Sequence, residues 1–201
     1  MSTITTTITT ITTPTLARPV LADLIPLTRL RDTVLVLVSL GFLIAAGQIA
    51  IPLWFTPVPL SLATFAVLLS GATLGPTRAA MSTMLYLGLG VVGAPFFAGQ
   101  ASGWSFASFG YIVGFVPAAI VVGLLARRRA DRSVLSTIAT ACLGSFIIYA
   151  AGLPWLIIFL DVNLATGLEL GVYPFLVGDA IKALAAALLL PAAWKLAEQT
   201  E

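Results

Sequence analysis

Long apolar stretches separated by short turn segments dominate this chain from residue 33 onwards. Each stretch is close to the roughly 20 residues that an α-helix needs to cross the hydrocarbon core of a bilayer. Proline and glycine mark the ends of several stretches, at Pro52, at Gly75-Pro76 and at Pro95. The pattern predicts six membrane-spanning helices, over residues 33–51, 58–74, 78–93, 107–126, 133–153 (with an extension to 160 left open) and 173–194.

The scarcity of charge agrees with a membrane location. Arg78 is the one charged side chain between Thr33 and Ala126, whereas soluble proteins carry roughly a quarter charged residues. The whole chain is 9% charged and 59% hydrophobic. We therefore expect an all-α integral membrane protein with one six-helix domain over residues 33–195. A Thr-rich tail over residues 1–32, disordered or loosely attached, precedes this domain, and a short tail over residues 196–201 follows it.

Basic residues collect on one side of the predicted bundle. They lie before the first helix, between the second and third, between the fourth and fifth, and after the sixth, as Arg29, Arg31, Arg78, Arg127, Arg128, Arg129, Arg132 and Lys195. The other three connections contain no Lys or Arg. Because loops rich in these residues stay in the cytoplasm, both termini are predicted to be cytoplasmic. The same rule accounts for the net charge of +2, which therefore does not indicate nucleic-acid binding.

Several kinds of chemistry lack the residues that they need. The single Cys142 rules out an internal disulfide and a thiolate metal cluster. The absence of His removes His-based zinc and haem sites and Ser-His catalysis. No second Asp lies within a predicted crossing, so a two-carboxylate protease mechanism cannot be assembled, and there is no Walker A loop. We expect neither an enzyme nor a metal site.

Two charges, Asp179 and Lys182, lie inside the last apolar stretch. At membrane depth an ionisable side chain costs roughly 2.5–3.5 kcal/mol, and such residues are commonly functional. Their spacing of three residues places both on one helix face. They form either a structural ion pair that neutralises itself or a polar ligand site. In the second case Asp179 accepts N–H donors and Lys182 meets an anion or another acceptor, in the outer half of the bundle.

Further candidates for ligand contact are uncharged. Gln48 near the outer end of the first helix is either a ligand contact or an interhelical hydrogen bond. Tyr86 and Tyr111 are either ligand contacts or interface anchors, and Trp155 is either an interface residue or a pocket wall. The outer loop over residues 94–106 is rich in glycine and aromatic residues, so it is either a plain connector or a lid over an outward-facing pocket.

The first predicted helix also has two pairs of small residues, Gly41 with Ala45 and Ala46 with Ala50. Small residues four apart permit close contact between helices. The pairs therefore indicate packing inside the bundle or docking of a partner subunit.

The order of several short motifs resembles one family. Each motif is weak alone, but the set is specific because of its order, its spacing and the Asp-x-x-Lys of the last helix. The motifs are Thr56-Pro57-Val58-Pro59, Leu74-Gly75-Pro76, the glycine-rich run over residues 86–99, Gly110-Tyr111-Ile112-Val113-Gly114-Phe115, and the run over residues 174–183. Over about residues 37–194 the chain resembles the BioY family, the biotin-specific membrane component of energy-coupling factor transporters.

This resemblance implies a six-helix subunit in the cytoplasmic membrane of a prokaryote that captures biotin from outside, with no covalently bound cofactor. It implies as partners a transmembrane coupling protein and two cytoplasmic ATPases, and a homo-oligomer stays open. The acidic and basic pair of the family falls on Asp179 and Lys182, and its Pro-Phe-Phe-Ala-Gly loop on Pro95–Gly99. We expect ligand contacts at Asp179, Lys182, Tyr86, Gln100, Gly99, Phe97, Tyr111, Trp155 and Gln48, and partner docking at Gly41, Ala45, Ala46 and Ala50.

The chain departs from the family pattern in its second predicted helix, where Ala63 stands at the position expected for a Gln. Two alternative functions also stay open. One is capture of a different vitamin. The other is a self-sufficient secondary transporter driven by an ion gradient, with Asp179 as the proton carrier. Such transporters usually contain inverted repeats, and the two halves of this chain show no clear repeat.

Overall fold

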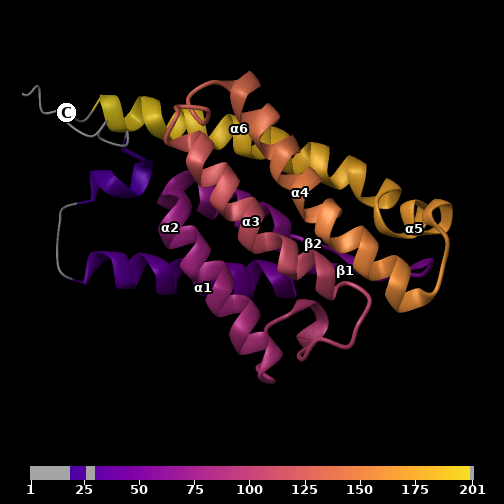
Figure 1. Ribbon diagram of the computed structural model, residues 1–201. Coiled ribbons are helices and arrows are strands. Elements are labelled where there is room, and N and C mark those ends of the chain that lie inside the picture. Colours follow the sequence, from indigo (N-terminus) through magenta and orange to yellow (C-terminus); the bar gives the residue numbers. More distant parts are fainter. Residues whose placement is uncertain (1–18, 26–29, 200–201) are drawn as a thin grey trace, which may run out of the picture.

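The computed structural model describes residues 19–25 and 30–199, which form a bundle of long helices (Figure 1). Four helical runs are long and apolar enough to cross a membrane: Arg31–Gln48, Phe109–Ala126, Val134–Leu160 and Leu164–Glu198. The multi-helix membrane architecture predicted from hydropathy is therefore confirmed. The elements in chain order are η1 (Leu21–Leu24), α1 (Arg31–Gln48), β1 (Ala50–Leu53), β2 (Thr56–Ser61), α2 (Ala63–Val91), η2 (Ala98–Gln100), α3 (Phe109–Ala126), α4 (Val134–Leu160), α5 (Leu164–Gly171), η3 (Tyr173–Phe175) and α6 (Leu176–Glu198).

A two-stranded hairpin replaces part of two predicted helices. Strands β1 and β2 pair antiparallel, with Ile51 opposite Leu60. The prediction of a helix from residue 58 is therefore wrong over its first five residues, and the first helix ends at Gln48 rather than at residue 51. Three prolines explain the difference, because proline cannot donate a hydrogen bond and forces the preceding residue into an extended conformation. They are Pro52, Pro57 and Pro59.

Helix α2 reverses direction at Gly75, where φ is 78° and ψ is 176°. The Ser70 hydroxyl accepts a hydrogen bond from Ser39, and the Ser82 hydroxyl donates to the carbonyl of Val36. Residues 70 and 82 would lie about 18 Å apart along a straight helix, yet their partners on α1 are within one helical turn. Only glycine adopts this backbone conformation without strain, so Gly75 joins two antiparallel limbs, residues 63–74 and 76–91.

The connection between α4 and α6 is more ordered than predicted. The six predicted helices leave residues 161–172 as a connection, but this segment contains α5. The Asn163 side chain accepts a hydrogen bond from the backbone N–H of Thr166 at 2.9 Å, which caps the helix. Before it, α4 continues through Pro154 to Leu160, in agreement with the extension that the sequence left open. The hairpin and α5 are joined at this end of the bundle, because Thr56 donates from Oγ1 to the carbonyl of Leu170 at 2.6 Å.

The described part of the N-terminal tail is attached to the bundle. Val20 is fully buried, and Asp23 forms an ion pair with Arg78 at 2.8 Å. The remaining tail, residues 1–18 and 26–29, lies outside the described residues. At the other end, α6 continues to Glu198, past the predicted domain boundary at residue 195.

Candidate functional site

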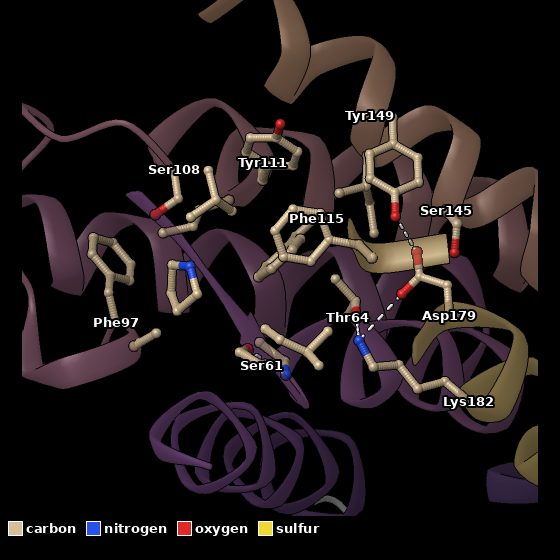
Figure 2. A pocket seen from close by; sticks show the side chains of 18 of the residues that line it. Ser61, Thr64, Phe97, Ser108, Tyr111, Phe115, Ser145, Tyr149, Asp179 and Lys182 are labelled. Carbon is tan, nitrogen blue, oxygen red and sulfur yellow. Dashed lines mark hydrogen bonds and ion pairs between the residues drawn. The ribbon is translucent and has the colours of Figure 1, made fainter. Parts of the chain in front are cut away.

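A cavity lies between the hairpin, both limbs of α2, and helices α3, α4 and α6 (Figure 2). The empty space between its walls is about 710 Å³, including the open mouth. Most of the wall is aromatic or aliphatic, and hydroxyl groups and one ion pair supply its polarity. The polar and charged side chains in the lining are Ser61, Thr64, Ser108, Ser145, Asp179 and Lys182, together with the hydroxyls of Tyr86, Tyr111 and Tyr149.

Asp179 and Lys182 form an ion pair at one end of this cavity (Figure 2). Lys182 Nζ lies 3.2 Å from Asp179 Oδ1 and donates to Thr64 Oγ1 at 2.8 Å. The Tyr149 hydroxyl donates to the other carboxylate oxygen, Oδ2. The side chains are 14% exposed for Asp179 and 9% for Lys182. The ion pair predicted as one of the two alternatives therefore forms, and it faces an open cavity.

This cluster keeps hydrogen-bonding capacity for a ligand. An ammonium group has three N–H donors, and Lys182 uses two of them, on Asp179 and Thr64. A carboxylate offers about four lone-pair sites, and Asp179 receives two hydrogen bonds, from Lys182 and Tyr149. One strong donor and two acceptor positions are thus left beside each other. Such a set suits a neutral group that both donates and accepts hydrogen bonds.

Aromatic side chains build the opposite end of the cavity. Phe97 is 1% exposed, and its ring packs edge-on against Tyr86 with centroids 5.3 Å apart. Phe106 follows, at 5.7 Å from Phe97. Gly90 makes room for this cluster, because a Cβ atom at that position would overlap the Phe97 ring. The loop between α2 and α3 is thereby folded over the cavity instead of extending away from it.

Gln48 and Tyr86 hold this loop in place. Gln48 Nε2 donates to the carbonyls of Phe96 and Phe97, at 3.1 and 3.0 Å. The Tyr86 hydroxyl donates to the same Phe96 carbonyl at 3.2 Å. Gln48 does not line the cavity, so it acts on the site through the loop, whereas the Tyr86 ring is also part of the wall.

Two other predicted contact residues use their polar groups on the backbone. The Tyr111 hydroxyl donates to the carbonyl of Gly171 at 2.9 Å and so ties α5 to α3, while its ring lines the cavity. Trp155 lies outside the lining, and its indole N–H donates to the carbonyl of Phe106 at 2.9 Å. Trp155 therefore positions the loop behind Phe106.

The remaining predicted residues fall outside the cavity. Gly99 and Gln100 belong to η2, where the backbone φ angles are 68° and 60°, and only their neighbour Ala98 joins the lining.

The small residues of the predicted docking face also separate in space. Gly41 and Ala45 are exposed on α1, but Ala46 is buried and Ala50 lies in β1. The Ala46 and Ala50 pair therefore forms no helix face, since the hairpin ends the helix before Ala50.

Several groups of the site are not recognisable from the sequence. Thr64 and Tyr149 contact the ion pair directly, and Ser61, Ser108, Ser145 and Phe115 line the cavity. Ordinary hydroxyl and aromatic residues within apolar stretches carry no local signal of such a role. Among the described residues, no group of three or more His, Cys, Asp or Glu side chains is placed to hold a metal ion.

The sequence profile of the BioY family matches residues 13–199. The chain belongs to the BioY family. A biotin transporter BioY from Rhizobium etli is 31% identical over 170 residues, covering 79% of this chain and 90% of the relative. A biotin transporter BioY from Thermotoga maritima is 33% identical over 152 residues, covering 74% and 87%. A probable biotin transporter BioY from Pyrococcus horikoshii is 37% identical over 136 residues, covering 66% and 78%.

The fold of this BioY-family chain is also similar to a crystal structure of the S-component for biotin from an ECF-type ABC transporter. The TM-score is 0.73, with 85% of this chain and 95% of that chain covered, and 24% sequence identity. The likeness extends over nearly the whole of that structure, so the two chains share one overall fold.

Proposed function

We propose that this protein binds biotin in the cavity beside Asp179 and Lys182 and serves its uptake across the membrane. Membership in the BioY family supports the ligand, since curated relatives are named as biotin transporters. The observation that carries the proposal is the pairing of one polar cluster with an otherwise apolar cavity. Biotin has the same division, with a polar ureido group fused to an apolar thioether ring.

The ureido group is proposed to lie at the ion pair. It has two N–H donors and one carbonyl, which complement the free acceptor positions of Asp179 and the third donor of Lys182. A carboxylate would fit less well there, because the Asp179 charge lies 3.2 Å from the ammonium group and opposes a second anion. The carboxylate tail of biotin is then directed away from the ion pair, toward Ser108 at the start of α3.

We further infer six membrane crossings: α1, the two limbs of α2, α3, α4 and α6. The reversal at Gly75 supports this number, since it turns α2 into two antiparallel segments. Each limb is shorter than a full span. The β-hairpin precedes the first limb and the loop follows the second, so these segments complete the two crossings. Irregular backbone is tolerated at membrane depth where it lines a cavity. With an even number of crossings and arginine-rich loops at one end, both termini lie in the cytoplasm of a prokaryotic cell.

The chain is proposed to act as the substrate-binding subunit of an energy-coupling factor transporter rather than as an enzyme. Its partners would be a transmembrane coupling protein and two cytoplasmic ATPases. Gly41 and Ala45 support a docking face on α1, because both are exposed and nothing lies within 4 Å of a Cβ built at Gly41. A second copy of the chain is an alternative occupant of that face.

Isothermal titration of the purified protein with biotin, thiamin and riboflavin tests the ligand. Saturable 1:1 binding of biotin alone is expected. Binding of another vitamin instead would keep the fold and overturn the ligand. Uptake assays in cells that lack the ATPase partners then separate a subunit, which should not transport, from a self-sufficient transporter.

The orientation of the ligand has its own test. Biotin and its primary amide, which lacks the negative charge of the tail, should lose the same factor in affinity when Lys182 is replaced by Met. A loss confined to biotin would place the carboxylate, and not the ureido group, at Lys182.

A further inference from the structure

A second cavity shares no lining residue with the one beside Asp179. It is an open groove between the first turns of α1 and the part of α2 around and after the reversal at Gly75. The groove holds about 890 Å³ of empty space, including space open to the outside. It lies at the arginine-rich end of the bundle, where α3 ends and Arg127 contributes to the lining.

One wall of the groove is apolar and faces the membrane. Val36 and Leu37 contribute it from α1, and Met81 and Leu85 from α2. Met81 and Leu85 are four residues apart, so they lie on one helix face. Leu37 is 54% exposed and Met81 52%. α1 is one of the helices long and apolar enough to span a bilayer, so the exposed side chains of this wall suit contact with lipid chains.

The charges around the groove do not cancel. Arg78 forms ion pairs with Asp23 at 2.8 Å and with Asp32 at 3.1 Å. Asp32 also forms an ion pair with Arg31 at 3.0 Å. These two arginines and two aspartates neutralise one another. Arg127 is therefore left with an unopposed positive charge.

In the part of the chain that the structure describes, Arg127 has an unsatisfied guanidinium nitrogen. Its Nε atom is buried and makes no hydrogen bond, and its guanidinium enters no ion pair among residues 19–25 and 30–199. A buried donor without an acceptor is rare in proteins and commonly indicates an ion that belongs to the site. Guanidinium groups bind phosphate through paired, charge-assisted hydrogen bonds.

We propose that this groove binds one anionic phospholipid, with the headgroup phosphate on Arg127 and an acyl chain along Leu37, Met81 and Leu85. The combination of an apolar wall inside the membrane with an unpaired guanidinium at its end matches the two parts of such a lipid. The net positive charge of the lining favours an anionic headgroup over a zwitterionic one. The proposal is independent of the ligand in the cavity beside Asp179.

Thermal unfolding and native mass spectrometry of the full chain in detergent test this site, with phosphatidylglycerol and phosphatidylcholine as probes. One retained phosphatidylglycerol and a lipid-dependent rise in Tm are expected. Arg127→Gln should weaken the retention about tenfold, whereas Arg128→Gln, an equal loss of charge at an exposed neighbour, should leave it unchanged. Equal losses in the two variants would indicate diffuse attraction and overturn the proposal.

Met81→Trp separates lipid binding from folding. The larger side chain fills the apolar part of the groove and leaves Arg127 intact, so the bound lipid should be lost while biotin titration stays unchanged. Retention of phosphatidylglycerol by this variant would contradict the proposed path of the acyl chain. Equal stabilisation by phosphatidylcholine, or by inorganic phosphate alone, would likewise rule out an anionic phospholipid as the occupant.

Discussion

Polar side chains lie at or beside both ends of the cavity, but their hydrogen bonds are used differently. At the end near α6, Lys182, Asp179 and Tyr149 bind one another and still present donors and acceptors to the empty space. At the end near the loop, Gln48 and Trp155 donate their hydrogen bonds to backbone carbonyls. The surface that faces the cavity there is aromatic. A polar residue near a membrane site thus contributes to ligand binding only where hydrogen-bonding capacity is left over.

This difference assigns separate tasks to the two ends. The polar end should determine how tightly the ligand is held, through charge-assisted hydrogen bonds. The aromatic end should determine how the loop covers the ligand, through packing and through bonds to the carbonyls of Phe96 and Phe97. Substitutions at the two ends are therefore expected to alter different quantities.

Lys182→Met should have the largest effect. It leaves the buried carboxylate of Asp179 with Tyr149 as its remaining partner, and breaking a buried pair in this way costs about 3–5 kcal/mol. The measurement is chemical or thermal unfolding. In the double variant Asp179→Asn/Lys182→Met the uncompensated charge is gone, so most of the stability should return. A single variant as stable as the parent would show that the pair does not interact strongly.

Gly90→Ala should come next and should act on the loop end. The added methyl group overlaps the ring of Phe97, and overpacking of this kind costs about 1–3 kcal/mol. Displacement of Phe97 should speed biotin dissociation, measured by stopped-flow exchange. Gly88→Ala is the matched control, because a Cβ there meets nothing within 4 Å. Equal rates in the two variants would disprove the role assigned to Phe97.

Tyr149→Phe should weaken biotin binding while leaving the loop intact. It removes the hydroxyl that donates to Asp179 and holds the carboxylate in place, a charge-assisted bond of about 1.5–3 kcal/mol. A ligand then meets a less well positioned carboxylate. Equilibrium titration should therefore show a loss of affinity of about tenfold or less. Tyr173→Phe, at an exposed tyrosine, serves as the control. An unchanged affinity in Tyr149→Phe would limit the polar end to Asp179 and Lys182.

Gln48→Ala should have the smallest effect. It removes two hydrogen bonds to the loop, but the Phe96 carbonyl still accepts the hydrogen bond from the Tyr86 hydroxyl. Because Gln48 is also exposed, we expect a loss of about 1 kcal/mol or less in the stability of the loop. Biotin dissociation should accelerate a few-fold, with little change in the rate of association. A loss of affinity as large as that of Lys182→Met would mean that Gln48 touches the ligand itself.

The parts of the fold that were predicted correctly depend on local information. The uniform apolar run of α3 was placed to within two residues, and the spacing of Asp179 and Lys182 determined that they share a helix face. The β-hairpin was missed because its residues are as apolar as those of a membrane helix, although Pro57 and Pro59 opposed a helix. Helix α5 has only 8 residues, too few to show a clear hydrophobic period, and the Asn163 cap is a weak signal alone.

The composition of the site needed tertiary structure. Thr64 meets Lys182 across 118 residues of chain, and Tyr149 meets Asp179 across 30. Nothing in the neighbouring sequence of either hydroxyl marks it, since hydroxyl groups are common in membrane helices. Gln48 is a candidate ligand contact because of its amide and Trp155 as a pocket wall, yet only the fold shows that both donate hydrogen bonds to backbone carbonyls.

The central claim is that the Asp179–Lys182 end of the cavity binds biotin. Equilibrium titration of biotin into the parent protein and into the Asp179→Asn/Lys182→Met variant tests it most directly, because that variant keeps the fold without a buried unpaired charge. The account predicts saturable binding to the parent and a loss of at least about a hundredfold in the variant, as expected when charge-assisted hydrogen bonds are removed. Undiminished binding to a folded variant would contradict the account and place the ligand elsewhere.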